Sequence, residues 1–133
     1  MIYKAFLVFF GSGLGGVLRY ALTGLIQNWW GPSFPLGTLI VNVSGCLVMG
    51  LLAAMMGGGG PVLVREEYRV AILIGIIGGY TTFSSFGRET MALVADGEWL
   101  FAALNVILSN LLGLLAVWAG AAISVKIYGP GAP

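Results

Sequence analysis

The sequence contains no histidine, a single cysteine (Cys46) and few charged residues. Only 8% of the 133 residues are charged, whereas water-soluble domains carry about 25%. Without histidine the chain lacks the commonest general base and metal ligand, and one cysteine cannot form an intramolecular disulfide. No pair of acidic residues lies at one depth, so a general acid–base set is missing and an enzyme is not expected. The net charge is +1 with scattered cations, which argues against nucleic-acid binding.

Apolar residues dominate instead: 59% of the chain is hydrophobic, and the mean hydropathy is +0.99. Four apolar segments each reach the roughly 20 residues that a helix needs to cross a bilayer. They cover about residues 3–26, 36–56, 69–94 and 99–123. We predict an all-α membrane protein with four transmembrane helices, forming a single domain over residues 1–133. In the first segment, Gly11 and Gly15 form a G-x-x-x-G pair, which predicts close packing against another helix.

The orientation in the membrane is only weakly specified. Four spans place both termini on one side, which would carry Lys4, Arg65, Arg69 and Lys126, with Arg19 and Arg88 toward the other. This bias of four cations to two is small for the positive-inside rule.

The third apolar segment contains the unusual sequence GIIGGYTTFSSFGRE, residues 75–89. Glycines loosen a helix, and hydroxyls can bond to carbonyls that a break sets free. Non-helical backbone at membrane depth survives only when it is buried in protein or lines a polar cavity. We therefore expect the third helix to be broken near Gly78–Thr81, with free carbonyls that form a cation site. Beyond the break, Phe83 and Phe86 share a helical face, either as ordinary core or with ring edges that favour an anion.

Other polar residues within the spans each leave two interpretations open. Arg19 either reaches the lipid headgroups or attracts anions at the mouth of an entrance. Asn42 either bonds across a helix interface or donates to a negative ligand. Asn105, Ser109 and Gly113 form a stripe along one face of the fourth helix, which indicates a lined pathway or a packing face. Asn110 points about 100° away from this stripe. Glu89 and Arg88 are expected to form an exposed ion pair.

Four fragments together resemble the bacterial Fluc/CrcB fluoride-channel family. They are GGVLRY (15–20), GTLIVNVSG (37–45), GGYTTFSSF (78–86) and the glycine-bearing last segment around Gly113. The resemblance implies a fluoride-selective passive ion channel that exports cytoplasmic fluoride across a bacterial-type inner membrane. It also implies an antiparallel, dual-topology homodimer with two pores. A structural sodium ion at the dimer interface would be held by the backbone carbonyls of Gly78 and Thr81.

The resemblance further implies which residues line the pore. These are Asn42, Thr82, Phe83, Ser84, Phe86 and Ser109, with Arg19 near an entrance. The chain departs from the family on its last helix: Asn105 stands where the family often has tyrosine, and Gly113 where some members carry a hydroxyl.

Two other functions are weighed against this one. A proton-coupled exporter of small cations, like the small multidrug-resistance proteins, needs an acidic residue deep in the membrane. The five acidic residues, Glu66, Glu67, Glu89, Asp96 and Glu98, all lie at or near the expected span ends, which weighs against that function. A non-transporting assembly subunit would use its glycines and serines for packing alone.

Overall fold

The computed structural model describes residues 1–57 and 60–129, and that part of the chain is helical with no strand. Four helical segments are long and apolar enough to cross a membrane: Ile2–Trp30, Leu36–Met56, Glu66–Ala95 and Trp99–Tyr128. The chain is therefore an all-helical, multi-pass membrane protein, and the four predicted spans are confirmed. Three spans extend beyond the predicted bounds, because the helices continue through the polar and charged residues that flank the apolar segments. The glycine run expected to separate the second and third spans includes residues 58 and 59, which lie outside the described residues.

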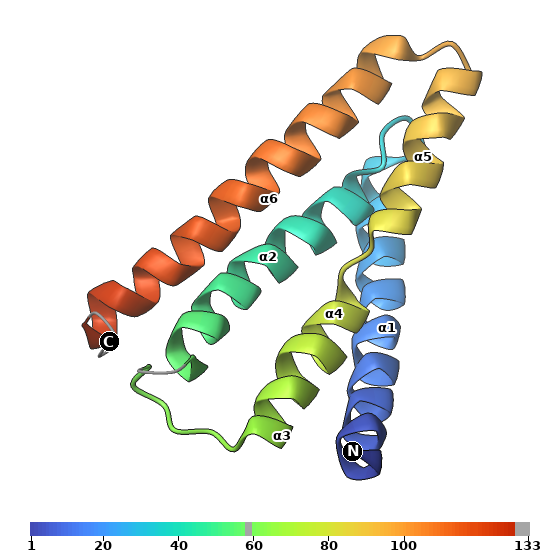
Figure 1. Ribbon diagram of the computed structural model, residues 1–133. Helices are drawn as coiled ribbons and strands as arrows, with labels where there is room; N and C mark the ends of the chain where they lie inside the picture. Colours follow the sequence, from blue (N-terminus) through green and yellow to red (C-terminus); the bar gives the residue numbers. More distant parts are fainter. Residues whose placement is uncertain (58–59, 130–133) are drawn as a thin grey trace.

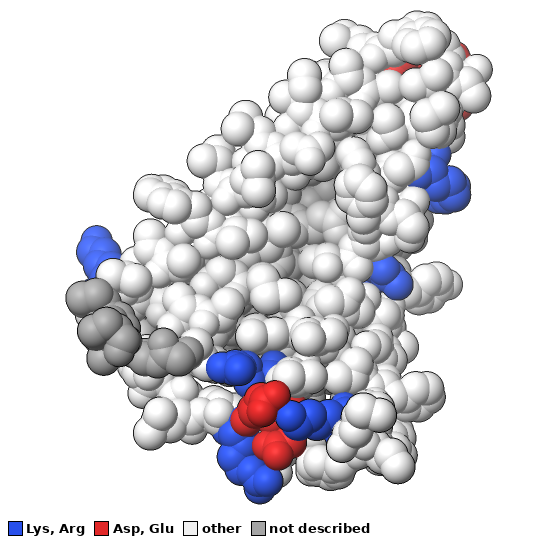
Figure 2. Space-filling model, in the orientation of Figure 1, with Lys and Arg blue, Asp and Glu red and all other residues white. Residues whose placement is uncertain are grey.

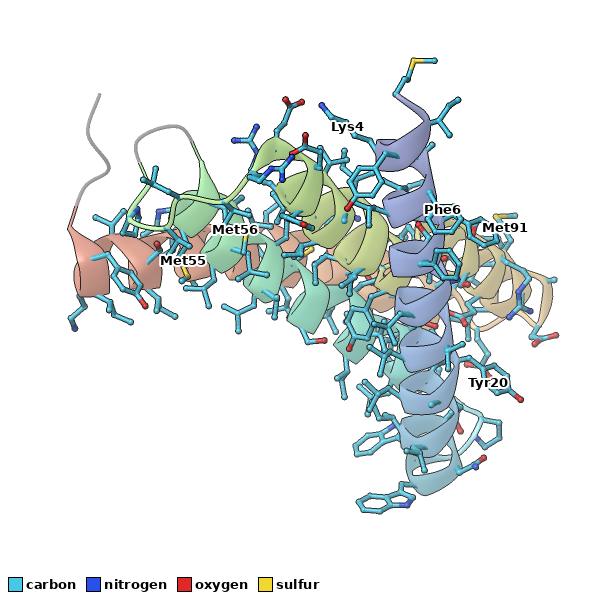
Figure 3. The ribbon with its side chains drawn as sticks, turned by 90° about the horizontal axis from the view of Figure 1, so that it is seen from below. Lys4, Phe6, Tyr20, Met55, Met56 and Met91 are labelled. Atoms are coloured by element: carbon cyan, nitrogen blue, oxygen red, sulfur yellow. The ribbon has the colours of Figure 1, made fainter. Side chains whose placement is uncertain are left out.

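The first span is α1 (Ile2–Trp30), and the second is α2 (Leu36–Met56). The third consists of α3 (Glu66–Val70), the π-helical turns η1 (Ala71–Ile77), α4 (Gly78–Tyr80) and α5 (Phe83–Ala95); the fourth is α6 (Trp99–Tyr128). α2 packs mainly along α6, and α1 packs against η1 and α4 (Figure 1). Seen from below, α1 runs across α2 and α6 rather than alongside them (Figure 3). The first part of the third span thus packs against α1, and its last part, α5, packs against α6.

Glycines allow α1 to approach the third span closely. A Cβ atom on Gly11 would lie 2.8 Å from the carbonyl oxygen of Ala71. A Cβ on Gly15 would lie 2.7 Å from the backbone nitrogen of Tyr80. Real Cβ atoms need more room, so only glycine fits at these positions. The close packing predicted from the G-x-x-x-G pair is confirmed.

Most charged side chains lie near the ends of the helices. Lys4, in the first turn of α1, forms an ion pair of 2.8 Å with Glu66 at the start of α3. Arg65 and Glu67 lie beside this pair with a separation of 3.5 Å. Most of the surface above this cluster is uncharged (Figure 2). That distribution suits a molecule whose middle faces lipid.

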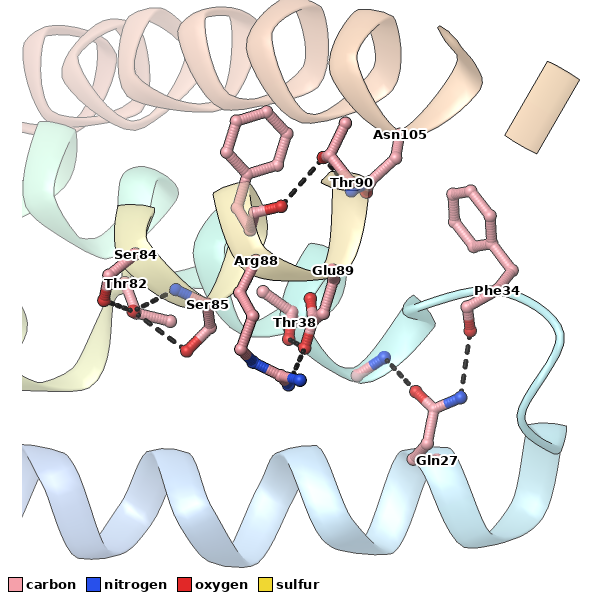
Figure 4. A network of polar contacts seen from close by, with 12 residues as sticks. Gln27, Phe34, Thr38, Thr82, Ser84, Ser85, Arg88, Glu89, Thr90 and Asn105 are labelled. Carbon is pink, nitrogen blue, oxygen red and sulfur yellow. Dashed lines mark hydrogen bonds and ion pairs between the residues drawn. The ribbon is translucent and has the colours of Figure 1, made fainter. Parts of the chain in front are cut away.

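The loop between α1 and α2 is held by the side chain of Gln27 (Figure 4). Its Nε2 donates to the carbonyls of Gly31 and Phe34, the latter at 2.9 Å. Its Oε1 accepts the N–H of Gly37 in the first turn of α2 at 3.3 Å. The Phe34 ring meets the Phe101 ring edge-on at 6.0 Å between centroids. One amide thus satisfies backbone groups that a helix end leaves without partners, and it fixes where α2 begins.

Candidate functional site

Between α4 and α5 the backbone leaves the helical conformation at Thr81 and Thr82. Their φ and ψ angles are −82° and 158°, and −151° and 120°. The hydroxyl of Thr81 donates to the carbonyl of Ile77 at 3.2 Å, and the hydroxyl of Thr82 accepts the N–H of Ser85 at 3.2 Å. The two threonines therefore cap the end of one helix and the start of the next. Gly78 itself is helical, with φ −63° and ψ −35°, so the non-helical residues follow the glycine pair.

Asn42 on α2 bonds to the extended backbone of Thr82 from both ends of its amide. Its Nδ2 donates to the carbonyl of Thr82 at 2.9 Å, and its Oδ1 accepts the N–H of Thr82 at 2.7 Å. Of the two interpretations left open from the sequence, the bond across a helix interface is therefore present. A primary amide has a second N–H, which these two bonds do not use, and Asn42 also lines a groove.

The non-helical conformation of Thr81 and Thr82 changes the partners of two carbonyls. In a continuous helix the carbonyls of Gly78 and Thr81 would accept the N–H groups of Thr82 and Ser85. Those N–H groups instead donate to Asn42 and to the hydroxyl of Thr82. The carbonyls expected to hold a cation thus lose their usual helical donors. In the described part of the chain, no group of three or more cysteine, aspartate or glutamate residues could hold a metal ion.

A groove of about 210 Å³ lies between α2, α5 and α6; it is called the central groove below. Its lining residues are Asn42, Cys46, Thr81, Thr82, Phe83, Phe86, Ser109 and Asn110. Five of the six predicted pore residues are among them. None of the eight side chains carries a charge, so the groove offers amides, hydroxyls, a thiol and aromatic rings. The sixth predicted pore residue, Ser84, is exposed and does not line the groove. Its hydroxyl lies 3.2 Å from the hydroxyl of Thr82.

Phe83 and Phe86 lie side by side in the first turn of α5. Their ring centroids are 5.2 Å apart, and the ring planes are tilted by 43°. Phe86 is only 9% exposed, whereas Phe83 is 80% exposed. The two rings therefore lie on a shared face, as predicted. Within one chain, only the Phe86 ring is buried by packing.

On the other side of α5, a second hollow of about 380 Å³ contains two arginines; it is called the arginine hollow below. Arg19 on α1 and Arg88 on α5 line it, together with Thr82, which also lines the central groove. Arg19 does not extend to the end of its helix, because its Nη1 donates to the carbonyl of Thr81 at 3.2 Å. The guanidinium thus lies beside one of the carbonyls expected to bind a cation.

Glu89 differs from the expected exposed ion pair. Only 19% of its side chain is exposed, and its Oε1 lies 3.8 Å from Arg88 and accepts the hydroxyl of Thr38 at 2.8 Å (Figure 4). Its Oε2 is buried without a hydrogen-bond partner in the described structure. The expected ion pair is present and Arg88 is exposed, but the expected exposure of Glu89 was wrong. Thr38 belongs to α2, and sequence spacing does not show which side chain of another helix faces α5.

The polar stripe on α6 divides between packing and groove. Asn105 is 2% exposed and donates to the hydroxyl of Thr90 on α5 at 2.9 Å, so it packs between helices. Ser109 lines the central groove, as does Asn110, which was expected to point away. Gly113 faces Cys46, whose sulfur would lie 3.6 Å from a Cβ at that position. Sequence reasoning missed Asn110 and Thr90 as neighbours of the site, and it did not include Cys46 or Thr38 among the site residues.

Comparison with known proteins gives the family. The sequence model described as "CrcB-like protein, Camphor Resistance (CrcB)" matches residues 6–121. The chain belongs to the CrcB-like family. Within it, the chain is 46% identical over 110 residues to the protein named fluoride-specific ion channel FluC of Rhodospirillum rubrum, covering 83% of this chain and 85% of the relative.

Two further relatives with the same name are from Paramagnetospirillum magneticum and Coxiella burnetii. The first is 48% identical over 114 residues, covering 86% of this chain and 89% of the relative. The second is 44% identical over 126 residues, covering 91% and 97%. The CrcB resemblance seen in the four sequence fragments is thus confirmed.

Proposed function

We propose that the protein is a fluoride-selective passive ion channel that exports cytoplasmic fluoride. The observation that carries this proposal is the central groove, which collects Asn42, Thr82, Phe83, Phe86 and Ser109 from three helices without a charged side chain. The names of the three relatives support fluoride as the permeating ion and an ion channel rather than an enzyme.

The chemistry of the groove suits a small, strongly hydrated anion. A pore must replace the water around such an ion with hydrogen-bond donors, and the ion must still be able to leave. Amide and hydroxyl donors can do this together with the positive edges of the rings of Phe83 and Phe86. A fixed positive charge in the groove would hold the anion more tightly. An uncharged lining therefore favours passage of the anion over tight binding in the groove.

No energy source is needed for export. Hydrogen fluoride is a weak acid that crosses membranes uncharged and ionises in the cytoplasm, where the anion is trapped. A membrane potential that is negative inside drives one negative charge outward by about 2.3 kcal/mol per 100 mV. We place the protein in a bacterial-type inner membrane on this reasoning, because that membrane carries such a potential.

The pore would be completed by a second copy of the chain. The Phe83 ring is 80% exposed in one chain, although it lines the groove. We propose an antiparallel, dual-topology homodimer in which each groove is covered by the partner, giving two pores. The bias of four cations to two is small enough for insertion in both orientations.

We also propose a third span that is functionally discontinuous, with a structural sodium ion at the dimer interface. The loss of the helical donors of Gly78 and Thr81, described above, supports a role for their carbonyls. A carbonyl has two lone pairs, so the Thr81 oxygen can accept from Arg19 and still face a cation. Arg19 would act at an entrance, since the arginine hollow and the central groove meet at Thr82.

The test is fluoride efflux from liposomes that contain the purified protein, with chloride efflux measured in parallel. The proposal predicts rapid loss of fluoride and retention of chloride without a proton gradient. Equal passage of chloride would refute the selectivity. Flux that requires a proton gradient and stops after Glu89→Gln would support the proton-coupled exporter, which the relatives' names do not favour.

A further inference from the structure

Asn105 is buried and polar, yet it lines neither hollow of the proposed channel. Asn105 is 2% exposed, and it lines neither the central groove nor the arginine hollow. A buried amide within a membrane span is costly unless its polar atoms are bonded. The partners of Asn105 therefore indicate what it does.

Three consecutive hydrogen bonds connect the central groove to the backbone of α5 through Asn105. The hydroxyl of Ser109 donates to Oδ1 of Asn105 at 3.4 Å, and Nδ2 of Asn105 donates to the hydroxyl of Thr90 at 2.9 Å. The Thr90 hydroxyl in turn donates to the carbonyl of Phe86 at 2.8 Å (Figure 4). Asn105 thus accepts from a side chain that lines the groove and donates to the neighbouring helix.

Ser109 differs in its hydrogen-bond acceptor from three other polar side chains of the third and fourth spans. Thr81, Thr90 and Asn110 each donate to the backbone carbonyl four residues earlier, at 3.2, 2.8 and 2.7 Å. Serine and threonine commonly form this bond inside helices. For Ser109 the corresponding acceptor would be the backbone carbonyl of Asn105, but the side-chain oxygen of that residue accepts instead. At 3.4 Å this bond is longer than a good O–H···O bond, so the hydrogen is weakly held.

We propose that Asn105 is a positioning residue that keeps the Ser109 hydroxyl available to an anion in the central groove. This inference rests on the proposed function. When the Ser109 hydrogen turns to the anion, Asn105 loses only its weak bond and remains attached to Thr90. Without Asn105, Ser109 donates to the backbone of its own helix at a shorter distance, and the groove loses a donor.

The test compares Asn105→Leu, Ser109→Ala and the double variant for fluoride efflux from liposomes. Leucine has the branching and the number of side-chain heavy atoms of asparagine, and Thr90 keeps its bond to the Phe86 carbonyl. Circular dichroism of each purified variant checks that the helical fold is retained. A donor to a charged ligand is lost in each case, so each single variant should conduct fluoride about tenfold more slowly. The double variant should be no slower than either single one. A wild-type rate for Asn105→Leu, or a loss of about a hundredfold in the double variant, would overturn the inference.

Thr90→Val is the matched control for a purely structural role of Asn105. It removes the bond between Asn105 and α5 but leaves the contact between Asn105 and Ser109, so fluoride efflux should stay close to wild type. A loss as large as that of Asn105→Leu would mean that Asn105 acts through helix packing, and the inference would fall. Absence of fluoride efflux from the wild-type protein would instead refute the proposed function itself.

Discussion

The double hydrogen bond between Asn42 and Thr82 holds the non-helical stretch in place, and Asn42→Leu tests this directly. Thr82 is 8% exposed, so water cannot replace the lost partners. Its N–H would be left unpaired, at a cost of about 1–3 kcal/mol. Its carbonyl keeps the first helical bond of α5 and loses a net bond worth about 0.5–1.5 kcal/mol. The total loss is about 1.5–4.5 kcal/mol of the free energy of unfolding.

The assay is denaturant unfolding of the purified protein in detergent, followed by circular dichroism. Asn110→Leu is the matched control, because Asn110 is exposed and donates only to the carbonyl of Val106 in its own helix. That variant should stay within about 0.5 kcal/mol of wild type. If Asn42→Leu is as stable as Asn110→Leu, the amide does not support the interruption, and the reasoning is refuted.

Three further predictions concern the framework around the site. Gly79→Ala should destabilise the protein by about 1–3 kcal/mol, because its Cβ would lie 2.6 Å from the carbonyl oxygen of Ser12. Gly13→Ala is the control and should leave the stability unchanged, because a Cβ there meets nothing within 4 Å. Equal unfolding midpoints for the two variants would contradict this prediction. Gln27→Leu should increase protease cleavage in the loop between α1 and α2, because the N–H of Gly37 and two loop carbonyls lose a partner; an unchanged cleavage rate would show that the loop is held otherwise. Lys4→Gln should lower the free energy of unfolding by no more than about 1 kcal/mol, because the Lys4–Glu66 pair is substantially exposed. A larger loss in the same denaturant unfolding assay would contradict this prediction and would mean that the ion pair contributes substantially to the stability of the fold.

Hydropathy predicted the four spans, and the glycine pair with its following hydroxyls led us to expect a break near Gly78–Thr81, next to the non-helical Thr81 and Thr82. Both are local properties: span length depends on a continuous apolar run, and threonine side chains cap helix ends within two or three residues. The glycines were misjudged in part. Gly78 remains helical, and Gly79 serves the contact with α1, because a missing side chain allows close packing as readily as it allows a break.

The partners across helices could not be predicted from the sequence. Asn42 is 40 positions from Thr82, and Thr38 is 51 positions from Glu89. Such pairs depend on how each helix is rotated about its axis, which packing of all four spans decides together. For the same reason, spacing alone did not show that Ser109 and Asn110, about 100° apart on one helix, both reach a groove wide enough to include them.

In the proposed channel, fluoride passes along the central groove beside the rings of Phe83 and Phe86 on α5. The most direct measurement is fluoride efflux from liposomes containing Phe86→Ile, compared with Phe9→Ile, in which the same change is made on a ring that is 72% exposed on α1. We expect Phe86→Ile to abolish efflux and Phe9→Ile to conduct like the wild type. Undiminished efflux through Phe86→Ile, with the protein folded and reconstituted, would contradict this expectation.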